Sequence, residues 1–214
     1  MAAQNGHGHG HGHGHHGHHG HHGNHRFANA EQWAQTFDDP ARDAWQKPEE
    51  VIGVLALGPA MTVADVGAGT GYFSVRLARA VPEGQVIATD VEPDMVRYLE
   101  ERARREKLPN LRAVMATATA SGLAAGSVDA ILIVDVWHHI ADRVGYARDL
   151  AAALRPGGRV VIVDFRLDAA KGPPREMRLA PEAIVADLEA AGFVAKVSPV
   201  ALPEQYMIEA TRAR

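Results

Sequence analysis

Three closely spaced glycines are the part of the sequence with the clearest chemical meaning. Gly67, Gly69 and Gly71 occur in the run VADVGAGTGY, directly after an apolar stretch. Glycine tolerates positive φ and lets a ligand lie against the backbone with no Cβ in the way. In an open α/β sheet, such a turn at the carboxyl end of the first strand is where nucleotides bind. We therefore expect a nucleotide-like ligand at this loop.

Asp90 is the second informative residue, because it closes the predicted strand that contains residues 86–89. Its carboxylate can accept two hydrogen bonds from a ribose diol. It follows Gly67 by 23 positions, a separation that accommodates one helix. An acid and a glycine loop at two strand ends of one βαβ unit favour a nucleoside site over a plain turn followed by a helix-capping acid.

The spacing of the glycines distinguishes between nucleotides. A dinucleotide fingerprint reads G-x-G-x-x-G, and a P-loop contains GK[ST]. Here the spacing is G-x-G-x-G, Tyr72 takes the place of the last dinucleotide glycine, and GK[ST] does not occur. A nicotinamide-dependent oxidoreductase is therefore kept only as an alternative.

The elements around these residues alternate between strand and helix. The predicted strands are 62–66, 85–89, 111–116, 128–134, 159–165, 193–200 and 206–211, and the predicted helices after the glycine loop are 72–81, 93–107, 142–154 and 181–191. Alternation of this kind is typical of a parallel sheet with helices on both faces. The last two strands are predicted to form an antiparallel pair. The fold class is thus α/β with three layers, mostly parallel with a reversed last strand.

The chain divides by composition into two parts. Residues 1–26 hold 11 of the 13 histidines, interleaved with glycines and with almost nothing apolar, which predicts a disordered tail. Residues 27–214 are predicted to form one folded domain. Imidazole suits zinc, nickel and copper, so a divalent metal is a candidate partner of the tail. A metal-binding protein with a non-catalytic domain is a second alternative. A purification tag or solubilising tail is the plainer interpretation of the segment, although its irregular histidine pattern looks more native than the unbroken run of an expression tag.

Composition also excludes several classes of function. The chain has no cysteine, which excludes disulfides, thiolate zinc sites and cysteine nucleophiles. A formal charge of −4 argues against nucleic acid as a partner. No apolar run approaches the roughly 20 residues that span a bilayer, and the N-terminus lacks the apolar core of a signal peptide. We expect a cytoplasmic protein with no membrane partner.

Four segments resemble, in order and spacing, the motifs of class I (Rossmann-like) S-adenosylmethionine-dependent methyltransferases. They are VADVGAGTGYFSVRLA, ATDVEPDMV, VDAILIVDVWHHI and LRPGGRVVIVD, spread over about residues 61–165. Small-molecule methyltransferases of the ubiquinone/menaquinone-biosynthesis type look most similar. The resemblance implies an enzyme that uses S-adenosyl-L-methionine as cofactor and transfers its methyl group directly to a small organic acceptor.

The resemblance also assigns the cofactor contacts. Gly67 and Gly69 would lie against the methionine part, and Asp65 would help to hold its ammonium group. Asp90 would bind both ribose hydroxyls, and Val91 would pack on the adenine.

Two further contacts are implied at the ends of the third and fourth strands. Asp135 would line the cleft near the methionine moiety and the substrate. Relatives often place an aspartate just after the third strand for the adenine amino group, whereas this chain has ATAT at 116–119. The adenine contact is therefore left to Thr117 or to a backbone group.

Candidates for catalysis follow the fourth strand in the run DVWHH. Because the sulfonium methyl is already electrophilic, the protein mainly has to align the reactants, and a base is needed only if the acceptor must lose a proton. Asp135, His138 and His139 are the candidates, since histidine titrates near neutral pH. Alternatively, the two histidines begin the next helix and bond to the backbone. Adjacent histidines cannot easily chelate one ion, so no metal site is expected here.

Two segments could cover the cleft. The stretch 33–47 carries aromatic residues together with Arg42 and Gln46, although such residues also suit a helix core and surface. The loop 166–179 follows the fifth strand and is a plausible substrate lid.

Overall fold

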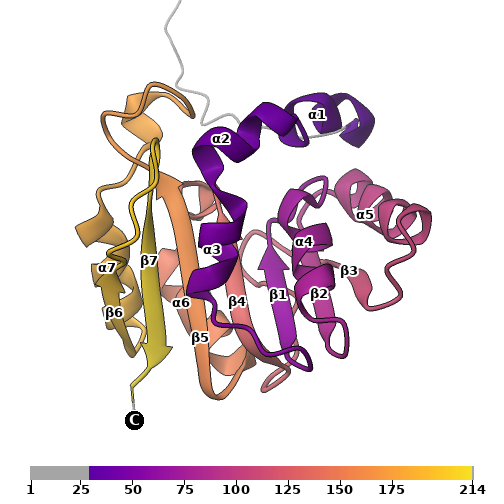
Figure 1. Ribbon diagram of the computed structural model, residues 1–214. Coiled ribbons are helices and arrows are strands. Elements are labelled where there is room, and N and C mark those ends of the chain that lie inside the picture. Colours follow the sequence, from indigo (N-terminus) through magenta and orange to yellow (C-terminus); the bar gives the residue numbers. More distant parts are fainter. Residues whose placement is uncertain (1–28, 214) are drawn as a thin grey trace, which may run out of the picture.

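The computed structural model describes residues 29–213, which form a seven-stranded sheet with helices on both faces (Figure 1). The strands are β1 (Thr62–Val66), β2 (Gln85–Asp90), β3 (Leu111–Met115), β4 (Val128–Val134), β5 (Leu154–Phe165), β6 (Phe193–Val197) and β7 (Gln205–Arg212). Their order is β3-β2-β1-β4-β5-β7-β6. Only β7 runs against its neighbours, so the predicted α/β sheet with a reversed last strand is confirmed. The tail prediction for residues 1–26 lies outside the described residues.

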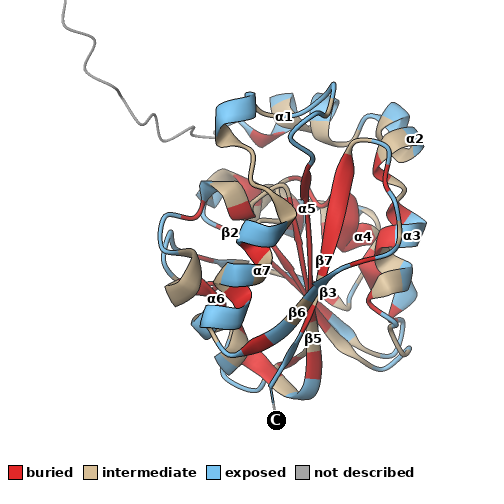
Figure 2. Cartoon of the chain, turned by 90° about the vertical axis from the view of Figure 1, so that its left-hand side faces the viewer, coloured by how far each residue is buried: buried red, intermediate tan, exposed pale blue. Residues whose placement is uncertain are grey.

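Two apolar clusters hold the helices to the sheet, one on each face (Figure 2). The helices are α1 (Ala30–Phe37), α2 (Asp43–Gln46), α3 (Pro48–Val54), α4 (Tyr72–Ala80), α5 (Pro93–Arg105), α6 (Arg143–Ala153) and α7 (Pro181–Ala190), with short 3₁₀ turns η1 (Pro40–Arg42), η2 (Trp137–His139) and η3 (Arg175–Met177). Helices α3, α4 and α5 pack on one face, and α6 and α7 on the other. Within residues 29–213, every helix is too short or too polar to cross a bilayer.

The strand order places the ends of β1, β2, β4 and β5 at one edge of the sheet. From β1 the chain winds outward through β2 and β3, then crosses back to β4 on the other side of β1. In open α/β sheets, the crevice at this reversal is where ligands bind. Helices α1 and α2 lie across the same edge (Figure 1).

Strand β5 differs from its predicted bounds, because it begins at Leu154 and not at Arg159. Leu154 pairs with Val128, after which the register shifts before the next pair, Ala130 with Arg159. Leu154 is buried, and Arg155 Nη1 lies 2.7 Å from Asp129 Oδ2, so this part of the chain stays on the sheet. The Pro-Gly-Gly sequence therefore forms an irregularity inside a strand, and the preceding helix ends at Ala153.

Candidate active site

The glycine loop between β1 and α4 is built from left-handed backbone. Gly67, Gly69 and Gly71 have φ of 70°, 55° and 93°. The N–H groups of Gly67 and Ala68 donate to the carbonyl oxygen of Thr89 at 2.8 and 3.0 Å, which fastens the loop to the end of β2. Positive φ at alternate positions is accessible to glycine at no steric cost, which explains the G-x-G-x-G spacing.

Gly67→Ala is expected to destabilise the domain and to displace the loop. An added Cβ would lie 2.3 Å from Val136 Cγ2, on top of the unfavourable φ. Overpacking and left-handed strain together cost about 2–5 kcal/mol, or roughly 5–15 °C in Tm for a domain of this size. Gly126→Ala is the matched control, because Gly126 has φ of 60° but no atom within 4 Å of the added Cβ. In thermal melts, an equal loss in both variants would show that the clash is unimportant.

Asp90 and the glycine loop form one unit. Asp90 is 8% exposed, and its two oxygens accept the N–H groups of Gly69 at 2.8 Å and Glu92 at 3.0 Å. Burial raises the pKa of this carboxyl, while the two backbone bonds oppose the increase. A carboxylate has about four lone-pair positions. Two remain for a diol, so the loop bond orients Asp90 without occupying it fully.

Two large apolar side chains stand exposed beside Asp90. Val91 is 51% exposed and Met115 is 45% exposed, and Met115 is the register partner of Asp90. Together they offer an apolar surface to a flat ring at the ends of β2 and β3. Thr117 is exposed in the following turn, where its hydroxyl accepts the N–H groups of Thr119 and Ala120. Met115 was not predicted, because its exposure depends on where β3 ends relative to β2.

Asp65 lies almost fully buried in β1, just before the loop. Its Oδ2 accepts a hydrogen bond from Ser74 Oγ at 2.5 Å. Burial raises its pKa to about 6, and the Ser74 bond and the Arg42 charge oppose this increase. A buried carboxylate that is costly to ionise is stabilised by an adjacent cation. Asp65 is thus suited to a ligand ammonium group.

Two threonine hydroxyls next to the loop lack a partner. Thr70 Oγ1 and Thr89 Oγ1 are buried and make no hydrogen bond with any described residue. An unsatisfied buried hydroxyl costs about 1–3 kcal/mol. Polar atoms of this kind at the glycine loop fit a site that is completed by a ligand.

Asp135 belongs to a ring of four polar side chains. Gln205 Nε2 donates to Asp135 Oδ1, and Gln46 Nε2 donates to Gln205 Oε1 at 2.5 Å. Arg42 Nε donates to Gln46 Oε1 at 2.5 Å, and Arg42 Nη2 lies 3.8 Å from Asp135 Oδ2. Asp135 has φ of 60°, which is strained for a non-glycine residue. Burial raises its pKa to about 7, although Arg42 opposes the increase.

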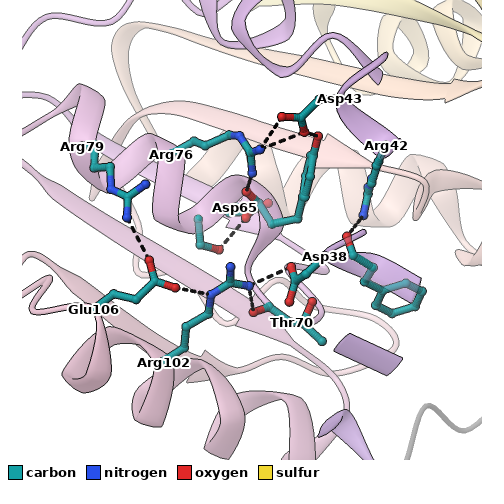
Figure 3. A network of polar contacts seen from close by, with 12 residues as sticks. Asp38, Arg42, Asp43, Asp65, Thr70, Arg76, Arg79, Arg102 and Glu106 are labelled. Carbon is teal, nitrogen blue, oxygen red and sulfur yellow. Dashed lines mark hydrogen bonds and ion pairs between the residues drawn. The ribbon is translucent and has the colours of Figure 1, made fainter. Parts of the chain in front are cut away.

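Residues 29–47, the N-terminal cover, are held over this edge by ion pairs (Figure 3). Arg102 of α5 donates to Asp38 and to the carbonyl of Thr70 in the glycine loop, both at 2.8 Å. Arg76 of α4 pairs with Asp43 at 2.8 Å. The stretch that was predicted as a cover therefore lies over the ends of the strands, and Arg102 ties it directly to the glycine loop.

His138 and Asp164 meet at the ends of β4 and β5. His138 Nδ1 lies 2.9 and 3.1 Å from the two carboxylate oxygens of Asp164, and the side chains are 3% and 0% exposed. His139 is exposed, with its ring centroid 4.2 Å from that of His138. Asp164 was missed, although an acid at the end of the fifth strand has the same positional signal as Asp135.

The loop 166–179 is organised around one guanidinium group. Arg178 donates to the carbonyl oxygens of Pro173 at 2.8 Å, Ala169 at 2.7 Å and Lys171 at 3.0 Å. At the start of the loop, Phe165 packs against Trp45 of the N-terminal cover, with ring centroids 5.8 Å apart. The loop thus borders the same edge of the sheet.

Comparison with known proteins agrees with this architecture. Residues 63–158 match the family model described as "Methyltransferase domain". A crystal structure of a SAM-dependent methyltransferase from Aquifex aeolicus superimposes with a TM-score of 0.77 and 27% identity, covering 85% of this chain and 97% of that one. Residues 63–158 therefore form a methyltransferase domain, and the described chain has the class I methyltransferase fold.

Sequence relatives of this methyltransferase domain are similar over part of their length. An uncharacterized methyltransferase of Mycobacterium tuberculosis is 37% identical over 61% of this chain and 50% of its own. A ubiquinone/menaquinone biosynthesis C-methyltransferase of Pasteurella multocida is 30% identical over 48% of this chain and 39% of its own. The chain thus spans about half the length, or less, of these curated relatives.

Proposed function

We propose that this methyltransferase uses S-adenosyl-L-methionine to methylate a small organic acceptor by direct transfer. The observation that carries the proposal is the hydrogen bond from the Gly69 N–H to Asp90. This bond joins the glycine loop, which a ligand can approach closely, and an acid suited to a ribose diol into one site. The relatives support it, since one is named a SAM-dependent methyltransferase and another a C-methyltransferase of quinone biosynthesis.

The residues present fit the cofactor at both of its ends. Asp90 would bind the ribose hydroxyls, and Val91 and Met115 would pack on the adenine. Asp65 would hold the ammonium group. Arg42, a buried cation stacked 4.2 Å from the ring centroid of Tyr72, would hold the carboxylate of the methionine part. When bound, S-adenosylmethionine supplies an electrophilic methyl group.

The acceptor would lie where the polar ring and the His138–Asp164 pair meet. Asp135 faces this region from β4, and the N-terminal cover brings Arg42 and Gln46 over it. These residues would orient the acceptor and exclude water, which is the main task of the protein in this reaction. The polar side chains gathered here suit a small organic molecule with polar groups of its own.

Calorimetry of the full-length protein tests the proposal with three ligands. S-adenosylhomocysteine is expected to bind with a stoichiometry of one per chain. NADH is expected to give no heat, because Tyr72 lies where a dinucleotide-binding loop has its last glycine. Zn²⁺ is expected to bind to residues 1–26 through their histidines, without changing the affinity for S-adenosylhomocysteine. Binding of NADH in place of S-adenosylhomocysteine would instead favour an oxidoreductase.

A further inference from the structure

We propose that His138 and Asp164 act as a general-base pair, and that the methyl acceptor carries an acidic hydroxyl group. The inference rests on the function proposed above and specifies the acceptor class of the same site. It is carried by the geometry of two buried side chains that the ends of β4 and β5 bring together.

The pair has the arrangement that fixes one tautomer of a histidine. Both contacts of the His138 ring with Asp164 run through Nδ1, and a carboxylate there favours the neutral tautomer with its proton on Nδ1 and its lone pair on Nε2, on the opposite side of the ring. The carboxylate is itself oriented, because its Oδ1 also accepts the N–H of Phe165 at 2.8 Å. His138 is thus held as a base, with Asp164 as its positioning residue.

The charges around the pair suit a histidine that gains a proton. Asp164 faces the ring from β5, and Asp135 faces it from the end of β4, where Asp164 raises and His138 lowers the pKa of the Asp135 carboxyl. On the cationic side, Arg42 of the N-terminal cover lies beside Asp135, and the His139 ring on η2 lies 4.2 Å from the His138 ring. The Asp164 carboxylate, 2.9 Å from Nδ1, is placed to remain hydrogen-bonded to the ring when Nε2 accepts a proton.

A base is required for only some acceptors. An ionised carboxylate or a neutral amine attacks a methyl group with its own lone pair, whereas a hydroxyl must lose its proton. The hydroxyl oxygen forms the new bond to the methyl carbon while the carbon–sulfur bond breaks, and that electron pair leaves with the thioether sulfur. The hydroxyl proton moves to His138 Nε2 and then to water. A phenolic or enolic hydroxyl, with a pKa near 10 as in tyrosine, is within reach of imidazole.

The test uses 4-nitrocatechol, a phenol whose ionised form is visible by its absorption. It is added to full-length protein saturated with S-adenosylhomocysteine, at a pH where the free probe is mostly unionised. We expect the wild type to produce the ionised form on binding. We expect His138→Gln and Asp164→Asn to reduce that signal roughly tenfold or more, which corresponds to one pKa unit in the base.

Matched controls separate this role from a structural one. Asp129→Asn alters an acid at the opposite edge of the sheet that also bonds a backbone N–H and an arginine, and it is expected to keep the full signal. All variants should keep wild-type affinity for S-adenosylhomocysteine, and their melting curves report folding. If the wild type fails to bind S-adenosylhomocysteine, the proposed function fails, and this inference with it. If it binds but the ionised signal is absent, or survives in His138→Gln, only the general-base pair is overturned.

Discussion

Asp90→Ala is expected to lower the affinity for S-adenosylhomocysteine by roughly 100-fold or more. Each hydrogen bond from a ribose hydroxyl to a carboxylate is worth about 1.5–3 kcal/mol, and the variant loses two. The loss is larger still because the N–H of Gly69 loses its acceptor, so that the loop is no longer held toward the ribose position. Calorimetric titration of the full-length variant measures the effect directly.

Two further variants sharpen this result. Asp90→Asn keeps an oxygen acceptor for the Gly69 N–H but loses the charge, so its affinity should fall between those of the wild type and Asp90→Ala. Asp129→Ala removes a comparable acid at the far edge of the sheet and should bind normally. Equal affinities for the wild type and Asp90→Ala would remove the basis for the cofactor assignment.

Asp65→Asn is expected to stabilise the ligand-free domain at pH 8 while weakening S-adenosylhomocysteine binding. Burial raises the pKa of Asp65 from 3.8 to about 6, so the folded chain holds this proton more tightly than the unfolded chain does. The resulting stabilisation is fully present below about pH 4 and is lost as the pH rises through 6. At 1.36 kcal/mol per unit, the loss amounts to about 3 kcal/mol.

Asparagine removes this ionisation and can still accept the Ser74 hydroxyl bond. The melting temperature of the variant should therefore exceed that of the wild type at pH 8 by roughly 5 °C or more, and the two should converge near pH 4. Asp129→Asn is the contrasting control, because it loses an ion pair with Arg155 and should melt lower at pH 8. A lower melting temperature for Asp65→Asn at pH 8 would mean that burial does not dominate at this carboxyl.

The opposed effects at Asp65 have a simple physical meaning. The buried Asp65 carboxylate destabilises the ligand-free domain, and a ligand cation beside it would offset that destabilisation. The domain is therefore less stable than it could be, at a position that favours binding. The strained φ of Asp135 and its pKa near 7 follow the same pattern at the next strand end. At Asp65 and Asp135, burial thus disfavours the ionised carboxylate, and the charged amino-acid part of a bound ligand would offset that cost.

The amino-acid sequence alone determined the parts of the site that depend on neighbours in the chain. The bounds of β1 and β4 were predicted to the residue, because each is a run of five to seven residues rich in β-branched side chains, too short for a typical helix and followed by turn residues. The glycine loop was recognisable because positive φ at alternate positions requires glycine. Asp90 followed from its place at the end of the next strand.

Only the tertiary structure decided which distant residues meet. The ring that joins Arg42, Gln46 and Gln205 to Asp135 spans most of the chain, and the pairing of His138 with Asp164 depends on β4 and β5 being neighbours. The early start of β5 likewise involves distant residues, because Leu154 pairs with Val128 and Arg155 contacts Asp129. The pattern of residue types over a short stretch of sequence specifies a helix or a strand, because backbone preferences act over a few residues. Side-chain pairs between elements depend on strand order and register, which the whole chain sets together.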